Sequence, residues 1–200
     1  MMRGTVGEFL IERLQSSGID TVFGIPGSYT LGFYDNLCKS KLEVVGTTTE
    51  LAAGYAADAY ARVRGLGCVC VTYCVGGFSV ANAVACAYAE KSPVIVISGP
   101  PGMKERDGKV LLHHMVGHFE CQHKMYEQIT CANTVLRDPE RAGYEIDRVL
   151  TAAQEFKQPV YIELPRDIVN KPIRYDPYTL LTPQEMKTDV HSLEESIGIS

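Results

Sequence analysis

The apolar positions change their period several times along the chain. Over 5–17 they recur at helical spacing, and Gly18 follows as a residue that suits a helix end. Short runs rich in Val, Ile, Leu and Cys predict strands at 19–23, 42–45, 68–73, 93–98, 129–135 and 160–164. Helices are predicted between them, over 31–37, 49–62, 81–89 and 139–156.

The predicted strands lack the alternation of apolar and polar residues that marks a strand with one face in water, which indicates burial on both faces. Strand and helix follow one another repeatedly. With right-handed crossovers this order gives an α/β fold, a doubly wound and mostly parallel sheet with helices on both faces. Ligands bind such sheets at the carboxyl ends of the strands, where 24–28, 47–50, 72–77 and 99–118 are expected to meet.

One domain is expected over residues 1–173. Beyond Pro165 the pattern loosens through three further prolines, so 174–200 is predicted to be a linker toward a following domain. Near its end, Ser192-Leu193-Glu194-Glu195 matches a capping box, which predicts the start of another helix.

Composition narrows the possible partners. The hydrophobic content of 46% suits a packed core, and a net charge of −5 with mixed signs gives no basic stripe for nucleic acid. We expect no membrane span and a cytoplasmic location, because the chain begins without a signal-type apolar stretch. The seven cysteines are interpreted as reduced, small buried side chains.

Glu50 is the most informative single residue. It lies just past a predicted strand and opens a helix that is otherwise rich in alanine and tyrosine. Position alone favours a simple interpretation, in which the carboxylate stabilises the positive end of the helix dipole. A catalytic role needs a further argument.

Resemblance to a known family supports a catalytic role for Glu50. The run Glu50-Leu51-Ala52-Ala53-Gly54-Tyr55-Ala56-Ala57-Asp58-Ala59-Tyr60-Ala61-Arg62 resembles the helix that carries the activating glutamate in thiamine-diphosphate enzymes. The similarity continues through 71–76, 81–90 and 93–99 to 159–165, and covers 3–173 as a pyrimidine-binding domain. Leu112-His113-His114 and 126–130 are similar to the pyruvate and indolepyruvate decarboxylase branch.

The resemblance implies a function for several residues. Glu50 would activate thiamine diphosphate through a pyrimidine ring nitrogen, and Gly27, Thr72 and Gly76 would help to bind the cofactor. His113 and His114 would relay protons, although without the resemblance they are equally well explained as a solvated loop pair. The implied reaction is non-oxidative decarboxylation of a 2-keto acid to an aldehyde.

The resemblance also implies partners. The family holds Mg²⁺ and the diphosphate through a Gly-Asp-Gly motif that does not occur in this chain. A complementary diphosphate-binding domain is therefore expected, in a homodimer or larger assembly. Whether that domain follows in the same polypeptide or belongs to a second subunit stays open.

Ser28 departs from the decarboxylase pattern. The branch usually has Gly-Asp-Tyr where this chain has Gly27-Ser28-Tyr29, and serine is no acid near neutral pH. Ser28 is similar to the benzoylformate decarboxylase and acetolactate synthase branches, where the serine can hydrogen-bond a substrate carboxylate. It can equally be a helix cap. An acetolactate-synthase-like carboligase and a non-catalytic binding or assembly domain are the alternative functions.

The sequence also contains a cluster of residue types that can bind metals. His113, His114, His118, Cys121 and His123 lie close in sequence, but His118 and His123 are five residues apart and miss the spacing that places two ligands on one helix face. No metal site is predicted in this chain.

Overall fold

A six-stranded parallel sheet forms the centre of the protein. The computed structural model describes residues 2–106, 111–175 and 190–198. The strand order is β3-β2-β4-β5-β7-β6, and all neighbouring pairs are parallel. The strands are β2 Thr21–Gly24, β3 Glu43–Gly46, β4 Gly67–Thr72, β5 Val94–Gly99, β6 Ala132–Val135 and β7 Val160–Glu163.

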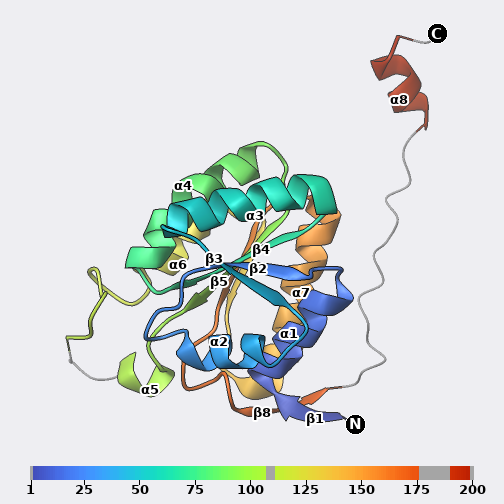
Figure 1. Cartoon of the computed structure of the whole chain (residues 1–200). Helices are drawn as coiled ribbons and strands as arrows, with labels where there is room; N and C mark the ends of the chain where they lie inside the picture. Colours follow the sequence, from blue (N-terminus) through green and yellow to red (C-terminus); the bar gives the residue numbers. More distant parts are fainter. Residues whose placement is uncertain (1, 107–110, 176–189, 199–200) are drawn as a thin grey trace.

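Helices cover both faces of the sheet (Figure 1). Large apolar side chains of α1, α2 and α7 pack on one face, and mostly small ones of α3 and α4 pack on the other together with Tyr126 at the end of α6. The predicted doubly wound α/β fold is confirmed. The helices are α1 Val6–Ser16, α2 Leu31–Cys38, α3 Glu50–Arg64, α4 Val75–Ala89, α6 Cys121–Tyr126 and α7 Pro139–Phe156.

The two central strands explain the continuous apolar runs of the sequence. Every residue of β4 and β5 is buried, because helices lie on both faces. Cys68 and Cys70 are fully buried in β4, as expected of small apolar side chains, and all seven cysteines are free thiols. The expectation of burial was wrong for Cys38, which is exposed at the end of α2, and Cys86, Cys121 and Cys131 are only partly buried.

Several short elements differ from the prediction. β1 (Met2–Thr5) pairs antiparallel with β8 (Pro172–Tyr175), and α5 (Met103–Arg106) forms one turn inside the segment expected to be a loop. The strand predicted from residue 129 begins at Ala132. These elements have four residues each, too few to show a period.

The C-terminal part is described only at its ends. Helix α8 (Val190–Ser196) begins two residues before Ser192, and residues 176–189 of the predicted linker lie outside the described residues. Within the described ranges, every helix is too short or too polar to cross a membrane.

Candidate functional site

The predicted site residues follow four neighbouring strands at one edge of the sheet. Because β2, β3, β4 and β5 are parallel, their carboxyl ends meet at this edge. Gly27 and Ser28 follow β2, Glu50 follows β3, Thr72 ends β4, and the histidine segment follows β5. The fold thus brings together segments that are far apart in the sequence.

Glu50 is the first residue of α3 and is partly buried. Thr49 caps this helix, since its side chain accepts a hydrogen bond from the Ala52 N–H at 3.2 Å. The Glu50 carboxylate itself forms no hydrogen bond or ion pair with any residue that the structure describes. It suits the positive end of the helix dipole, as the simple interpretation requires, and it is also available to a ligand.

Glu50 lies beside the first turn of α4. Its Cγ is 3.6 Å from the position that a Cβ on Gly76 would occupy. The same hypothetical Cβ would lie 3.2 Å from Thr72 Cγ2. A Cβ at position 76 would therefore be tight against Thr72 and in ordinary van der Waals contact with Glu50.

Thr72 joins the third segment to the site. A Cβ on Gly27 would lie 2.5 Å from Thr72 Cβ, so the β2–α2 loop passes directly over the end of β4. Thr72 is buried, and its hydroxyl has no hydrogen-bond partner among the described residues. An unpaired buried hydroxyl costs about 1–3 kcal/mol, which a ligand group could recover by bonding to it. The structure thus brings Gly27, Glu50, Thr72 and Gly76 together.

His113 is held by the loop after β2. Its Nε2 lies 2.6 Å from Ser28 Oγ, and its ring stacks on Tyr29 with 4.5 Å between centroids. The Tyr29 hydroxyl donates to the His113 carbonyl oxygen at 3.1 Å. His113 is exposed, but these contacts hold its ring in place. It is therefore not a freely solvated loop residue.

His114 is held differently. Its backbone has a φ of 64°, in the left-handed region that few non-glycine residues adopt. The two imidazole rings meet edge to face at 4.7 Å, and His114 Nδ1 is buried without a partner among the described residues. Such a conformation costs roughly 1–3 kcal/mol and is typical of functional sites.

Ser28 does not cap α2. The cap position is Thr30, whose hydroxyl accepts a hydrogen bond from the Gly27 N–H at 2.9 Å and lies at the same distance from the Gly27 carbonyl. The interpretation of Ser28 as a helix cap was wrong, because the turn closes two residues later. Its exposed hydroxyl faces His113 instead.

An ion pair also lies close to Tyr29. The Arg166 guanidinium lies 5.4 Å from the Tyr29 ring centroid and is bonded to Glu105 of α5. The hydrogen bond from Arg166 lowers the pKa of Glu105, and burial raises the pKa of Tyr29. No sequence signal links Glu105 to Arg166, since they are 61 residues apart.

The other residues of the metal-ligand cluster do not gather around one point. His118 Nδ1 lies 3.1 Å from Cys121 Sγ, and His123 Nε2 lies 3.0 Å from Asn133 Oδ1. Among the residues that the structure describes, no three His, Cys, Asp or Glu side chains come together in a way that could hold a metal ion.

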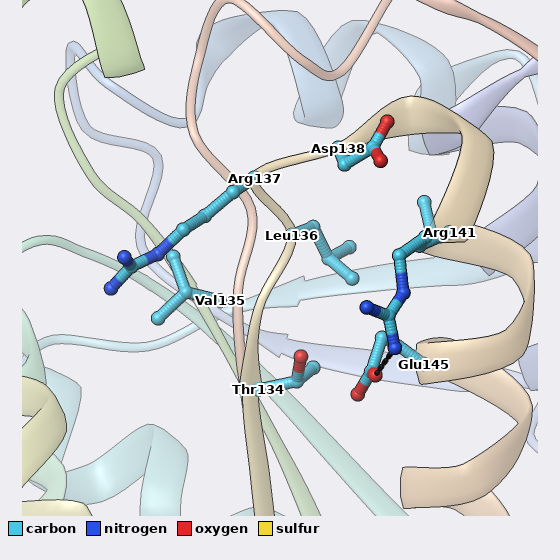
Figure 2. A pocket seen from close by; sticks show the side chains of 8 residues that line it. Thr134, Val135, Leu136, Arg137, Asp138, Arg141 and Glu145 are labelled. Carbon is cyan, nitrogen blue, oxygen red and sulfur yellow. Dashed lines mark ion pairs between the residues drawn. The ribbon is translucent and has the colours of Figure 1, made fainter.

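A separate pocket lies at the far end of the same sheet edge, between β6 and α7 (Figure 2). Its volume is about 370 Å³, and its charged lining residues are Arg137, Asp138, Arg141 and Glu145. Arg141 and Glu145 form an ion pair at 3.8 Å. With two cations and two carboxylates, the pocket has no net charge, and none of the predicted site residues lines it.

Comparisons with known proteins bear on this site. The family described as "Thiamine pyrophosphate enzyme, N-terminal TPP binding domain" matches residues 4–129. The chain is 44% identical over 177 residues to indole-3-pyruvate decarboxylase of Azospirillum brasilense, covering 86% of this chain and 32% of that protein. It is 43% identical over 171 residues to alpha-keto-acid decarboxylase of Mycobacterium tuberculosis, covering 84% and 30%. The chain thus spans about a third of the length of these curated relatives.

Proposed function

Because the chain belongs to the thiamine pyrophosphate enzyme family as an N-terminal TPP binding domain, we propose that it forms the pyrimidine side of the cofactor site in a 2-keto acid decarboxylase. The free carboxylate of Glu50, beside Gly76 and the unpaired hydroxyl of Thr72, carries this proposal. The relatives named as decarboxylases support the reaction, in which a 2-keto acid gives an aldehyde and carbon dioxide without oxidation.

The residues at the edge fit an aminopyrimidine ring. Glu50 offers a carboxylate without a protein partner among the described residues, and Thr72 offers a hydroxyl. Gly27 and Gly76 both pack closely against Thr72, so the absence of side chains at these two positions lets the three segments meet. When bound, thiamine diphosphate supplies the electron sink for decarboxylation. Glu50 would share a proton with a pyrimidine ring nitrogen.

The histidines would move protons at the other side of the site. An imidazole suits proton transfer near neutral pH. Ser28 Oγ is bonded to His113 Nε2 and is exposed, so it can orient the imidazole and also reach a substrate carboxylate. His114, with its unpaired Nδ1, offers a second position for a proton.

The complete enzyme requires more than this chain. We expect a complementary domain to hold Mg²⁺ and the diphosphate, assembly as a homodimer or larger, and a cytoplasmic location. The isolated chain should then bind the cofactor weakly. Titration of thiamine diphosphate with Mg²⁺ into the chain, followed by calorimetry, tests this, and a sub-micromolar Kd would contradict it.

Glu50→Gln in the complete enzyme tests the central assignment. Glutamine keeps the size of the side chain but cannot share a proton in the same way, so exchange of the thiazolium C2 proton should be abolished. Exchange is followed by NMR in deuterium oxide. Glu43→Gln, an exposed carboxylate at the opposite end of β3, is the matched control. Near-normal exchange in Glu50→Gln would remove Glu50 from this role.

The comparisons do not favour the carboligase or the non-catalytic alternative. Ser28 is the feature that suggested a carboligase, and product analysis with pyruvate separates the two reactions. An aldehyde supports decarboxylation, whereas an acetohydroxy acid supports carboligation.

A further inference from the structure

The turn between β4 and α4 contains a strained residue. Cys74 has a φ of 54° and a ψ of −86°. These backbone angles are close to those of the rare classic γ-turn, which residues other than glycine seldom adopt. Cys74 is fully buried. Such a conformation persists only where the surrounding structure holds it. Two residues later, Gly76 faces Glu50.

Gln122 of α6 holds this turn. The Cys74 N–H donates to Gln122 Oε1, so the amide group of the strained residue is satisfied by a side chain. Gln122 is fully buried and lies directly against the next turn. A Cβ on Gly77 would come within 2.2 Å of Gln122 Oε1, so position 77 admits only glycine while Gln122 stays in place.

The orientation of Gln122 is itself fixed. Its Nε2 donates to Ser98 Oγ on β5 and to the Tyr161 hydroxyl on β7. Tyr161 in turn donates to Glu163 Oε1 at 2.9 Å. Glu163 is fully buried and pairs with Arg106 of α5 at 3.2 Å. The Glu163 carboxylate can only accept hydrogen bonds, so the Tyr161 hydroxyl donates to it and accepts from Gln122 Nε2. This fixes Gln122 Oε1 as the end of the amide that faces Cys74.

We propose that Gln122 is a positioning residue for the cofactor edge. By accepting the Cys74 N–H, it keeps the strained turn in the conformation that places Gly76 and the start of α4 against Glu50. The proposal rests on the proposed function of that edge. It assigns a role in the site to a buried amide that contacts neither Glu50 nor His113 in the structure.

The first test needs no cofactor. In the cofactor-free full-length enzyme, amide hydrogen exchange of the peptide over 73–80 is measured by mass spectrometry. Gln122→Ala should raise the exchange rate of this peptide roughly tenfold or more, because the turn loses its only side-chain acceptor among the described residues. Gln128→Ala, an exposed glutamine just beyond α6, is the matched control and should leave the rate unchanged.

The second test asks whether Gln122 affects the site through the conformation of the turn at Cys74. In the full-length enzyme with thiamine diphosphate and Mg²⁺, Gln122→Ala should slow C2 proton exchange by roughly tenfold to a hundredfold, as a small displacement of a catalytic surface does. Adding Cys74→Gly should restore most of the rate, because glycine adopts this backbone conformation without strain. Cys74→Gly alone is the reference for the double variant.

The outcomes decide the proposal. Normal amide and C2 exchange in Gln122→Ala would overturn it, and so would a slow C2 exchange that Cys74→Gly does not restore. If Gln122→Ala does not fold, Ser98→Ala removes one partner of the amide, and the same rescue by Cys74→Gly is required. Normal C2 exchange in Glu50→Gln would instead refute the proposed function, and the amide exchange result would still stand.

Discussion

The two halves of the site differ in how their polar groups are satisfied. Around Glu50, the carboxylate and the Thr72 hydroxyl have no partner among the described residues, and the contacts are made by glycines. Around His113, the ring has a hydroxyl partner and a stacked aromatic ring. Since native proteins seldom leave buried polar groups unpaired, the first half is suited to being completed by a ligand. In the second half the chain itself satisfies the His113 ring, and only His114 Nδ1 is left without a partner among the described residues.

The two halves also rest on different supports. Ion pairs tie α5, which precedes the histidines in the sequence, to β7 and to the segment just after it, from Arg106 to Glu163 and from Glu105 to Arg166. The Glu50 half depends on the close approach of Gly27 to Thr72 and on the turn that Gln122 holds. Changes in the histidine half should therefore alter turnover or stability, whereas changes in the Glu50 half should alter cofactor binding or C2 proton exchange.

The largest expected effect is on stability, from Arg106→Met. Removing one partner of a buried ion pair leaves Glu163 uncompensated and should lower the free energy of unfolding by about 3–5 kcal/mol. Urea unfolding of the chain measures this. Lys104→Met, on the exposed side of the same turn, is the control. A loss as small as that of Lys104→Met would show that this ion pair is not the support of the histidine segment.

The next effect separates the two halves functionally. His113→Phe keeps an aromatic ring stacked on Tyr29 but removes the hydrogen bond to Ser28. Turnover of a 2-keto acid by the complete enzyme should fall about a hundredfold, which is typical for loss of a proton-transfer group, while C2 proton exchange stays normal. His118→Phe, outside the site, should change neither. If His113→Phe slowed C2 exchange as much as turnover, the division into two halves would be wrong.

Gly27→Ala acts on the Glu50 half. The new Cβ would lie 2.5 Å from Thr72 Cβ, so the loop must move, at a cost of about 1–3 kcal/mol in stability. Thermal unfolding measures this cost, and calorimetry should show weaker cofactor binding by the complete enzyme. Gly46→Ala is the control, because nothing lies within 4 Å of its hypothetical Cβ. Unchanged binding would show that the approach of Gly27 to Thr72 does not shape the cofactor surface.

The smallest effect concerns pH. Arg166 lowers the pKa of Glu105 in the folded protein, so the unfolded chain binds more protons over this range. The resulting stability is present above the ordinary carboxyl pKa of 4.5 and is lost as the pH falls through the lowered value. Glu105→Gln should cost up to about 1 kcal/mol at pH 7, and the difference should vanish in acid. Urea unfolding at several pH values tests this, with Glu43→Gln as the control. A difference that stays constant with pH would contradict it.

Much of the fold was predictable because it depends on local periodicity. The parallel sheet followed from continuous apolar runs, and α7 was predicted with both of its bounds correct. Asp138 at its cap and Pro139 at its first position are strong local signals. By contrast, β1 and β8 owe their structure to pairing across about 170 residues, from Met2 to Tyr175.

The sequence alone determined the fold class and singled out Glu50, His113 and His114, because strand and helix periods are local and the residue types of the site stand in recognisable runs. Only the tertiary structure decided that Ser28 meets His113, 85 residues away, and that Thr72 keeps an unpaired hydroxyl. The same holds for the Cys74 turn on Gln122, since the conformation of one residue and its distant partner depends on how the layers pack.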